Sequence, residues 1–172
     1  MKIGVISDTH GNLFAWNRVF EYLKNCDYII HCGDVLAPGP KNPIPDGYDP
    51  PGLTSAINNL KIPIFIAKGN CDSEVDSILL KPPIATPYVV LQDEKNRIIA
   101  THGHIQFDPK IFGARIFITG HTHIPNLEEK EDIIYLNPGS PSVPLNKEKT
   151  FAIIEDERIT IFNLDGKIIS NL

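Results

Sequence analysis

Short apolar runs that each end in a polar, metal-ligating motif constrain this chain more than any other feature. The first run contains Ile3, Val5 and Ile6, β-branched residues typical of a buried strand. Asp8 and His10 follow at once. Because side chains two residues apart in an extended chain point to the same side, we expect a carboxylate and an imidazole side by side at this strand end. Such a pair is half of a metal site or half of an acid–base pair.

The same pattern recurs at later strand ends. Glycine precedes Asp34, Asn70 and His121, so the chain can leave each strand tightly and approach a ligand closely. Each motif alone is more often a turn or a hydrogen-bonded core residue. Together they supply seven candidate metal ligands: Asp8, His10, Asp34, Asn70, His102, His121 and His123. Seven donors exceed one tetrahedral zinc site and suit two ions that share a bridging carboxylate.

Length and composition favour a soluble, single-domain protein. The 172 residues fit one domain over residues 1–172, and 42% hydrophobic residues suffice for a core. The formal charge of −5, without a Lys/Arg cluster, argues against a nucleic-acid-binding surface. No apolar run approaches the roughly 20 residues of a membrane span. Three cysteines without paired spacing and the absence of a signal peptide favour the cytoplasm.

The N-terminal half predicts an α/β arrangement. Helical spacing of apolar residues covers 13–24 and 53–60, and buried strands are expected at 28–32 and 62–67. Alternating strands and helices predict a parallel sheet that carries its ligands at the carboxyl ends of the strands. The proline-rich stretch 36–52 is expected to form a long ordered loop without helix. Whether this loop shapes specificity or an oligomer contact stays open.

The C-terminal half predicts strands with almost no helix between them. Tyr88–Gln92 and Arg97–Thr101 read as a hairpin with its turn at 93–96. Further strands are expected at 115–119, 133–136, 151–155, 158–163 and 167–169. We therefore expect the strands of the C-terminal half to be mostly antiparallel and to be joined by hairpins.

The ordered motifs resemble those of the calcineurin-like metallophosphoesterases. The residues within and beside these motifs resemble those of the small bacterial and archaeal phosphodiesterase branch. That branch also contains a retromer subunit that has turned to protein binding. The segments that carry this resemblance are Ser7-Asp-Thr-His-Gly11, Gly69-Asn-Cys-Asp-Ser73, Thr101-His-Gly-His104 and Asn137-Pro-Gly-Ser140. It covers essentially the whole chain, including the proline-rich loop.

The resemblance implies a four-layer α-β-β-α sandwich of two mixed sheets. It places one ion on Asp8, His10 and His123 and the other on Asn70, His102 and His121, with Asp34 as the bridge. It favours Mn among the divalent metals, while the mixed N/O ligands also suit Zn, Fe or Ni. The implied reaction is hydrolysis of a small phosphodiester by a metal-bridging hydroxide. A homo-oligomer is a further expectation, because relatives often assemble.

Two residues near the implied centre have less certain roles. Cys71 stands where many relatives carry a histidine that is thought to protonate the leaving oxygen, and close to two cations its thiol would tend toward thiolate, which cannot donate a proton. Activated diesters should therefore be preferred, although Cys71 as a packing residue explains the position equally well. His104 is a candidate for a phosphate contact or a surface anchor.

Two alternative functions stay open. A metal-binding scaffold for protein partners would follow the retromer relative, but it has no need of seven intact ligands. A phosphomonoesterase or nucleotidase would keep the fold and the ions. The cysteine at position 71 argues against that second alternative.

Overall fold

Strand β1 lies in the middle of the first sheet, and four of its five residues are buried. The structure, a computed structural model, describes residues 1–92, 96–156 and 158–172. In spatial order the first sheet contains β12 (Ile168–Asn171), β11 (Arg158–Asn163), β10 (Thr150–Glu155), β1 (Lys2–Ile6), β2 (Tyr28–His31), β3 (Ile64–Ala67) and β4 (Ile84–Ala85). Strands β1 to β4 are parallel, whereas β10 to β12 are antiparallel to their neighbours.

The second sheet is also mixed. In spatial order it contains β5 (Val89–Gln92), β6 (Arg97–Ala100), β7 (Ile116–Ile118), β9 (Ile133–Asn137) and β8 (Asn126–Lys130). Its central strands β6, β7 and β9 are parallel, and both edge strands are antiparallel to their neighbours. Each sheet thus holds a parallel block whose carboxyl ends carry candidate ligands.

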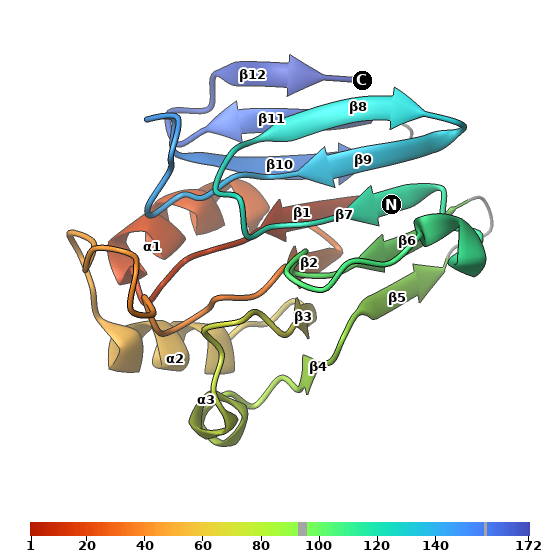
Figure 1. Cartoon of the computed structure of the whole chain (residues 1–172). Coiled ribbons are helices and arrows are strands. Elements are labelled where there is room, and N and C mark those ends of the chain that lie inside the picture. The colour runs from red at the N-terminus through yellow and green to blue at the C-terminus, as the bar shows by residue number, and fades with distance from the viewer. Residues whose placement is uncertain (93–95, 157) are drawn as a thin grey trace.

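Apolar residues of both sheets meet in one core and hold the sheets face to face. Val5 and Ile30 of the first sheet belong to this core together with Ile98 and Ile118 of the second. On its outer side the first sheet is covered by α1 (Leu13–Leu23) and α2 (Pro50–Asn58), whose buried faces share a second core with β1, β2 and β3 (Figure 1). A third, smaller cluster covers the outer face of the second sheet.

The expected four-layer sandwich is confirmed, with one thin outer layer. Over the second sheet the cover contains the 3₁₀ helix η1 (Pro109–Phe112) and an aromatic group of Tyr88, Phe107 and Phe112. Ring centroids in this group lie 4.8–5.6 Å apart at steep angles, the geometry that aromatic pairs prefer.

Two expectations about helices were incomplete. Helix α2 begins at Pro50, inside the stretch expected to be a loop, with Asp49 as its N-cap. Proline is tolerated in the first turn because those backbone N–H groups have no helical partner anyway. The short helix α3 (Glu74–Leu79) was not predicted, although Ser73 and Asp76 form a capping box at its start.

The prediction that the strands of the C-terminal half are mostly antiparallel was wrong for the middle of the second sheet. Buried runs such as Ile116–Ile118 contain no signal for strand direction, and β6, β7 and β9 pair in parallel. Strand β8 was missed because its sequence, Asn126–Lys130, is polar, as befits an exposed sheet edge. The expected hairpin of β5 and β6 is present, and residues 93–95 of its turn lie outside the described residues.

Candidate metal centre

The turns that leave the strands place their ligands in strained backbone conformations. Five of the seven candidate ligands have φ between 45° and 67°: Asp8, His10, Asp34, His121 and His123. This left-handed region is unfavourable for residues other than glycine, so the surrounding structure must impose it. Hydrogen bonds between neighbouring strand exits do so, because Asp8 N–H donates to Gly33 O and His10 N–H donates to Asp34 O, both at 3.0 Å. Backbone strain of this kind is common at functional sites.

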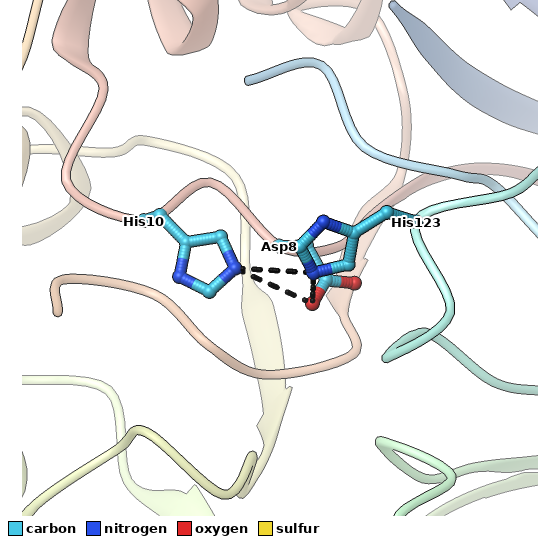
Figure 2. Close-up of side chains that lie close together, drawn as sticks. All are labelled: Asp8, His10 and His123. Atoms are coloured by element: carbon cyan, nitrogen blue, oxygen red, sulfur yellow. Dashed lines mark hydrogen bonds and ion pairs between the residues drawn. The ribbon is translucent and has the colours of Figure 1, made fainter. Parts of the chain in front are cut away.

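Asp8, His10 and His123 converge in a buried cluster (Figure 2). The Nε2 atoms of His123 and His10 lie 3.1 and 3.7 Å from Asp8 Oδ1, and 3.3 Å from each other. Asp8 Oδ1 has no hydrogen-bond partner among the described residues. A buried oxygen without a donor, facing two imidazole nitrogens, fits a cation at this position.

Backbone carbonyls fix which nitrogen of each imidazole faces the centre. The Nδ1 atoms of His10, His102 and His123 lie 2.7–2.8 Å from the carbonyl oxygens of Ala37, Cys32 and Val143. Since a carbonyl only accepts, each Nδ1 carries the proton, and each Nε2 presents its lone pair to the centre. Metal-binding histidines are commonly oriented in this way.

The electrostatics of the first cluster favour a positive charge. Burial alone raises the pKa of Asp8, but contacts with His123 and His102 outweigh it and hold the pKa below its usual value. Burial lowers the pKa of His123, whereas its contact with Asp8 reverses that shift and leaves the pKa raised. The pair therefore attracts a cation, and a proton competes for the same place.

Asp34, Asn70, His102 and His121 form the adjoining group. Asp34 Oδ2 lies 3.5 Å from His102 Nε2 and 3.8 Å from His10 Nε2, so one carboxylate oxygen faces both clusters. Its other oxygen accepts the backbone N–H of Cys71 at 2.8 Å. Asn70 Oδ1 and His121 Nδ1 lie 3.0 and 3.2 Å from His102 Nε2. All seven predicted ligands thus lie close together, and one oxygen of Asp34 faces both clusters.

Hydrogen bonds from neighbouring residues hold these ligands. Ser7 Oγ donates to Asp8 Oδ2 at 2.6 Å, and Ser140 Oγ donates to the Asp8 carbonyl at 2.8 Å. Asn137 Nδ2 donates to Gly120 O at 2.8 Å, next to His121. The segment 137–140 thus supports two ligand-bearing turns.

Cys71 and His104 flank the centre at different depths. The Cys71 side chain is half-buried, and burial followed by the neighbouring Asp34 carboxylate raises its pKa to about 12. Bound cations would act in the opposite direction. The His104 ring is exposed, with its centroid 5.3 Å from that of His102 and 6.2 Å from that of His121. Burial and then the two imidazoles lower the pKa of His104.

A cavity of about 270 Å³ opens onto the centre. It is lined by Asp34, Pro38, Gly39, Pro40, Lys41, Asn42, Asn70, Cys71, His121 and His123. Half of this lining, residues 38–42, comes from the proline-rich loop, which sequence reasoning left without a role. No sequence signal marks these loop residues, because their position depends on how the loop packs against the turns that carry His10 and Cys71.

The chain belongs to the calcineurin-like phosphoesterase superfamily, whose domain model matches residues 1–158. It is 35% identical over 176 residues to phosphodiesterase YfcE of Escherichia coli K12, covering 98% of this chain and 95% of that protein. The solved structure of the E. coli phosphoesterase YfcE superimposes with a TM-score of 0.91 at 33% identity, covering 100% and 98% of the two chains.

The fold is also that of a solved Vps29. The zinc-bound Vps29 structure of Entamoeba histolytica gives a TM-score of 0.67 at 19% identity, covering 100% of this chain and 98% of that one. Within the described residues, the helices are all too short or too polar to cross a membrane. The single domain over 1–172, the cytoplasmic location and a homo-oligomer stay predictions.

Proposed function

We propose that this chain is a phosphodiesterase that hydrolyses a small phosphodiester with the help of two divalent cations. The observation that carries the proposal is the convergence of seven ligand groups in two adjoining clusters, with Asp34 facing both and Asp8 Oδ1 lacking a hydrogen-bond partner among the described residues. Kinship with phosphodiesterase YfcE supports the diester as substrate. Mn is the metal proposed, with Zn, Fe or Ni as alternatives.

The ligand set fits such a pair of ions. Asp8, His10 and His123 would hold one ion, Asn70, His102 and His121 the other, and Asp34 both. When bound, the ions would supply an activated water and neutralise charge on the phosphoryl group. Imidazole, amide and carboxylate donors without thiolate ligands suit first-row divalent metals.

The chain's own residues perform the remaining tasks. Ala37 O, Cys32 O and Val143 O keep three imidazoles oriented, so little reorganisation is needed when a substrate binds. Residues 38–42 form one wall of the cavity of about 270 Å³ that would hold the ester. Cys71 lines the cavity next to the proposed ions, where its thiol would tend toward thiolate and could not protonate a leaving oxygen, which favours substrates with good leaving groups.

Hydrolysis of an aryl phosphodiester, compared with the matching monoester, tests the proposal. Protein stripped with chelator is assayed before and after addition of Mn, Zn, Fe or Ni, with Asp34→Asn as the control. We expect metal-dependent cleavage that favours the diester, and loss of both activity and most metal loading in Asp34→Asn. Near-normal turnover by Asp34→Asn would overturn the two-ion proposal. A metal-loaded protein that is silent on both esters would favour a scaffold, and preference for the monoester a phosphomonoesterase.

A further inference from the structure

The start of the proline-rich loop, residues 37–39, is in direct contact with residues of the metal centre. Ala37 O accepts the Nδ1 proton of His10 at 2.8 Å. A Cβ atom added to Gly39 would lie only 2.6 Å from Cys71 Sγ, so the loop backbone packs directly against that side chain. The loop is therefore a fixed wall of the cavity, and its polar side chains have defined positions.

Asn42 is the half-buried amide of this wall. Its Nδ2 donates to Pro38 O at 2.9 Å and lies 3.4 Å from His10 Nε2. A carbonyl oxygen only accepts, so the contact with Pro38 fixes the amide with its nitrogen toward the centre. One N–H of Asn42 is thereby used within the loop, and the other is directed at His10 Nε2.

The second N–H of Asn42 loses its acceptor once His10 acts as a ligand. Because His10 Nδ1 carries the proton, Nε2 has one lone pair, and a cation would take it. A half-buried donor then needs another acceptor. The cavity that Asn42 lines is the place where a phosphoryl group would present its oxygens.

We propose that Asn42 is a catalytic residue whose free amide N–H donates a hydrogen bond to a non-bridging phosphoryl oxygen of the substrate. This inference rests on the proposed function. A donor held by the protein in advance stabilises charge that builds up on the phosphoryl oxygens during attack. Asn42 thus complements the cations without adding charge to the centre.

The test compares Asn42→Ala and Asn42→Leu with the parent protein. Both variants remove the donor and differ in volume, so a shared effect follows the donor and not the space it fills. Asn126→Ala, on the exposed edge strand β8, is the matched control. Each protein is loaded with Mn, and three properties are measured: metal content, the dissociation constant of inorganic phosphate by calorimetry, and kcat and KM for an aryl phosphodiester.

We expect unchanged metal content in both variants, phosphate binding weakened about 10-fold, and kcat/KM lowered about 10- to 100-fold, mainly through kcat. Unchanged phosphate affinity and turnover would overturn the inference. Loss of metal together with activity would also overturn it, because Asn42 would then act only by holding the loop on His10. If the parent fails to cleave the diester, the proposed function fails, and phosphate binding alone decides the role of Asn42.

Discussion

The carboxylate of Asp72 accepts the backbone N–H of Asp34 at 2.9 Å. It also accepts the N–H groups of Val35 and Gly69, each at 2.7 Å. One buried side chain thus joins the turn after β2 to the turn after β3. These two turns carry Asp34 and Asn70, so the distance between the proposed bridge and a proposed ligand depends on Asp72.

Asp72→Asn should loosen both turns. An amide retains one acceptor oxygen and turns an NH₂ group toward a backbone N–H, which leaves a buried donor unsatisfied at a cost of about 1–3 kcal/mol. We expect a loss of stability of that size, lower metal content and at least a 10-fold fall in kcat. Urea unfolding, metal analysis and diester hydrolysis measure these effects. Asp165→Asn, which affects only a surface ion pair with Arg18, is the control. Equal metal content in Asp72→Asn and the parent would contradict the expectation.

Cys71→His should broaden the range of leaving groups. Because a thiolate beside bound cations has no proton to donate, the rate should fall steeply as the pKa of the leaving alcohol rises. A histidine can protonate the leaving oxygen near neutral pH. We therefore expect the variant to gain most on alkyl diesters and least on nitrophenyl diesters. The measurement is kcat/KM across a series of diesters, and parallel dependence on leaving-group pKa in both proteins would show that position 71 does not act as an acid.

His31 should make stability depend on pH. Its Nδ1 accepts the Gly33 N–H at 3.1 Å, and its Nε2 donates to Thr9 Oγ1 at 3.0 Å, so the ring is held neutral. Burial, the largest cause, lowers the pKa of His31 to about 3, below the ordinary value of 6.5. The unfolded chain therefore binds a proton first as the pH falls. The stability contributed by neutral His31 is fully present above pH 6.5 and is lost toward pH 3, by up to about 1.4 kcal/mol per pH unit.

Replacing His31 isolates this contribution. His31→Gln retains a polar side chain without a group that titrates in this range, so its stability should fall less between pH 7 and pH 5 than that of the parent. Urea unfolding at each pH, in chelator, gives the two slopes. Parallel slopes would show that His31 is not the source of the pH dependence.

The seven candidate ligands could be picked out from the sequence because strand ends and glycine turns are local features. Each buried run could be recognised from its own residues, whereas Asp8 and His10 lie beyond β1 at φ of 55° and 45° and converge through left-handed turns and not, as expected, through extended alternation. Strand direction is not local, which is why β6, β7 and β9 were expected to be antiparallel. The polar strand β8 has a single partly buried apolar residue, Leu127, and its pairing with β9 depends on backbone hydrogen bonds.

The supporting residues of the centre depend on tertiary structure in the same way. Asn42 is an ordinary loop residue until the proline-rich loop folds back over His10. Ser140 reaches the Asp8 carbonyl from 132 positions along the chain. Asn12, whose side chain accepts the Ala15 N–H, is by contrast a local feature, because an N-cap is marked by residues next to it in the sequence.

Gly69→Ala should disturb the metal centre by steric overlap alone. A Cβ atom at this position would overlap both the backbone N and the Oδ1 of Asp34. The carboxylate that faces both clusters would have to move, so we expect a loss of bound metal and at least a 100-fold fall in activity. Gly166→Ala is the control, because its φ of 79° makes the substitution strained at a position that contacts Tyr22. That variant should lose stability and keep its metal. The added methyl group leaves the Asp34 side chain no room where it now lies. If Gly69→Ala also kept its metal, metal binding would therefore not depend on the position of Asp34.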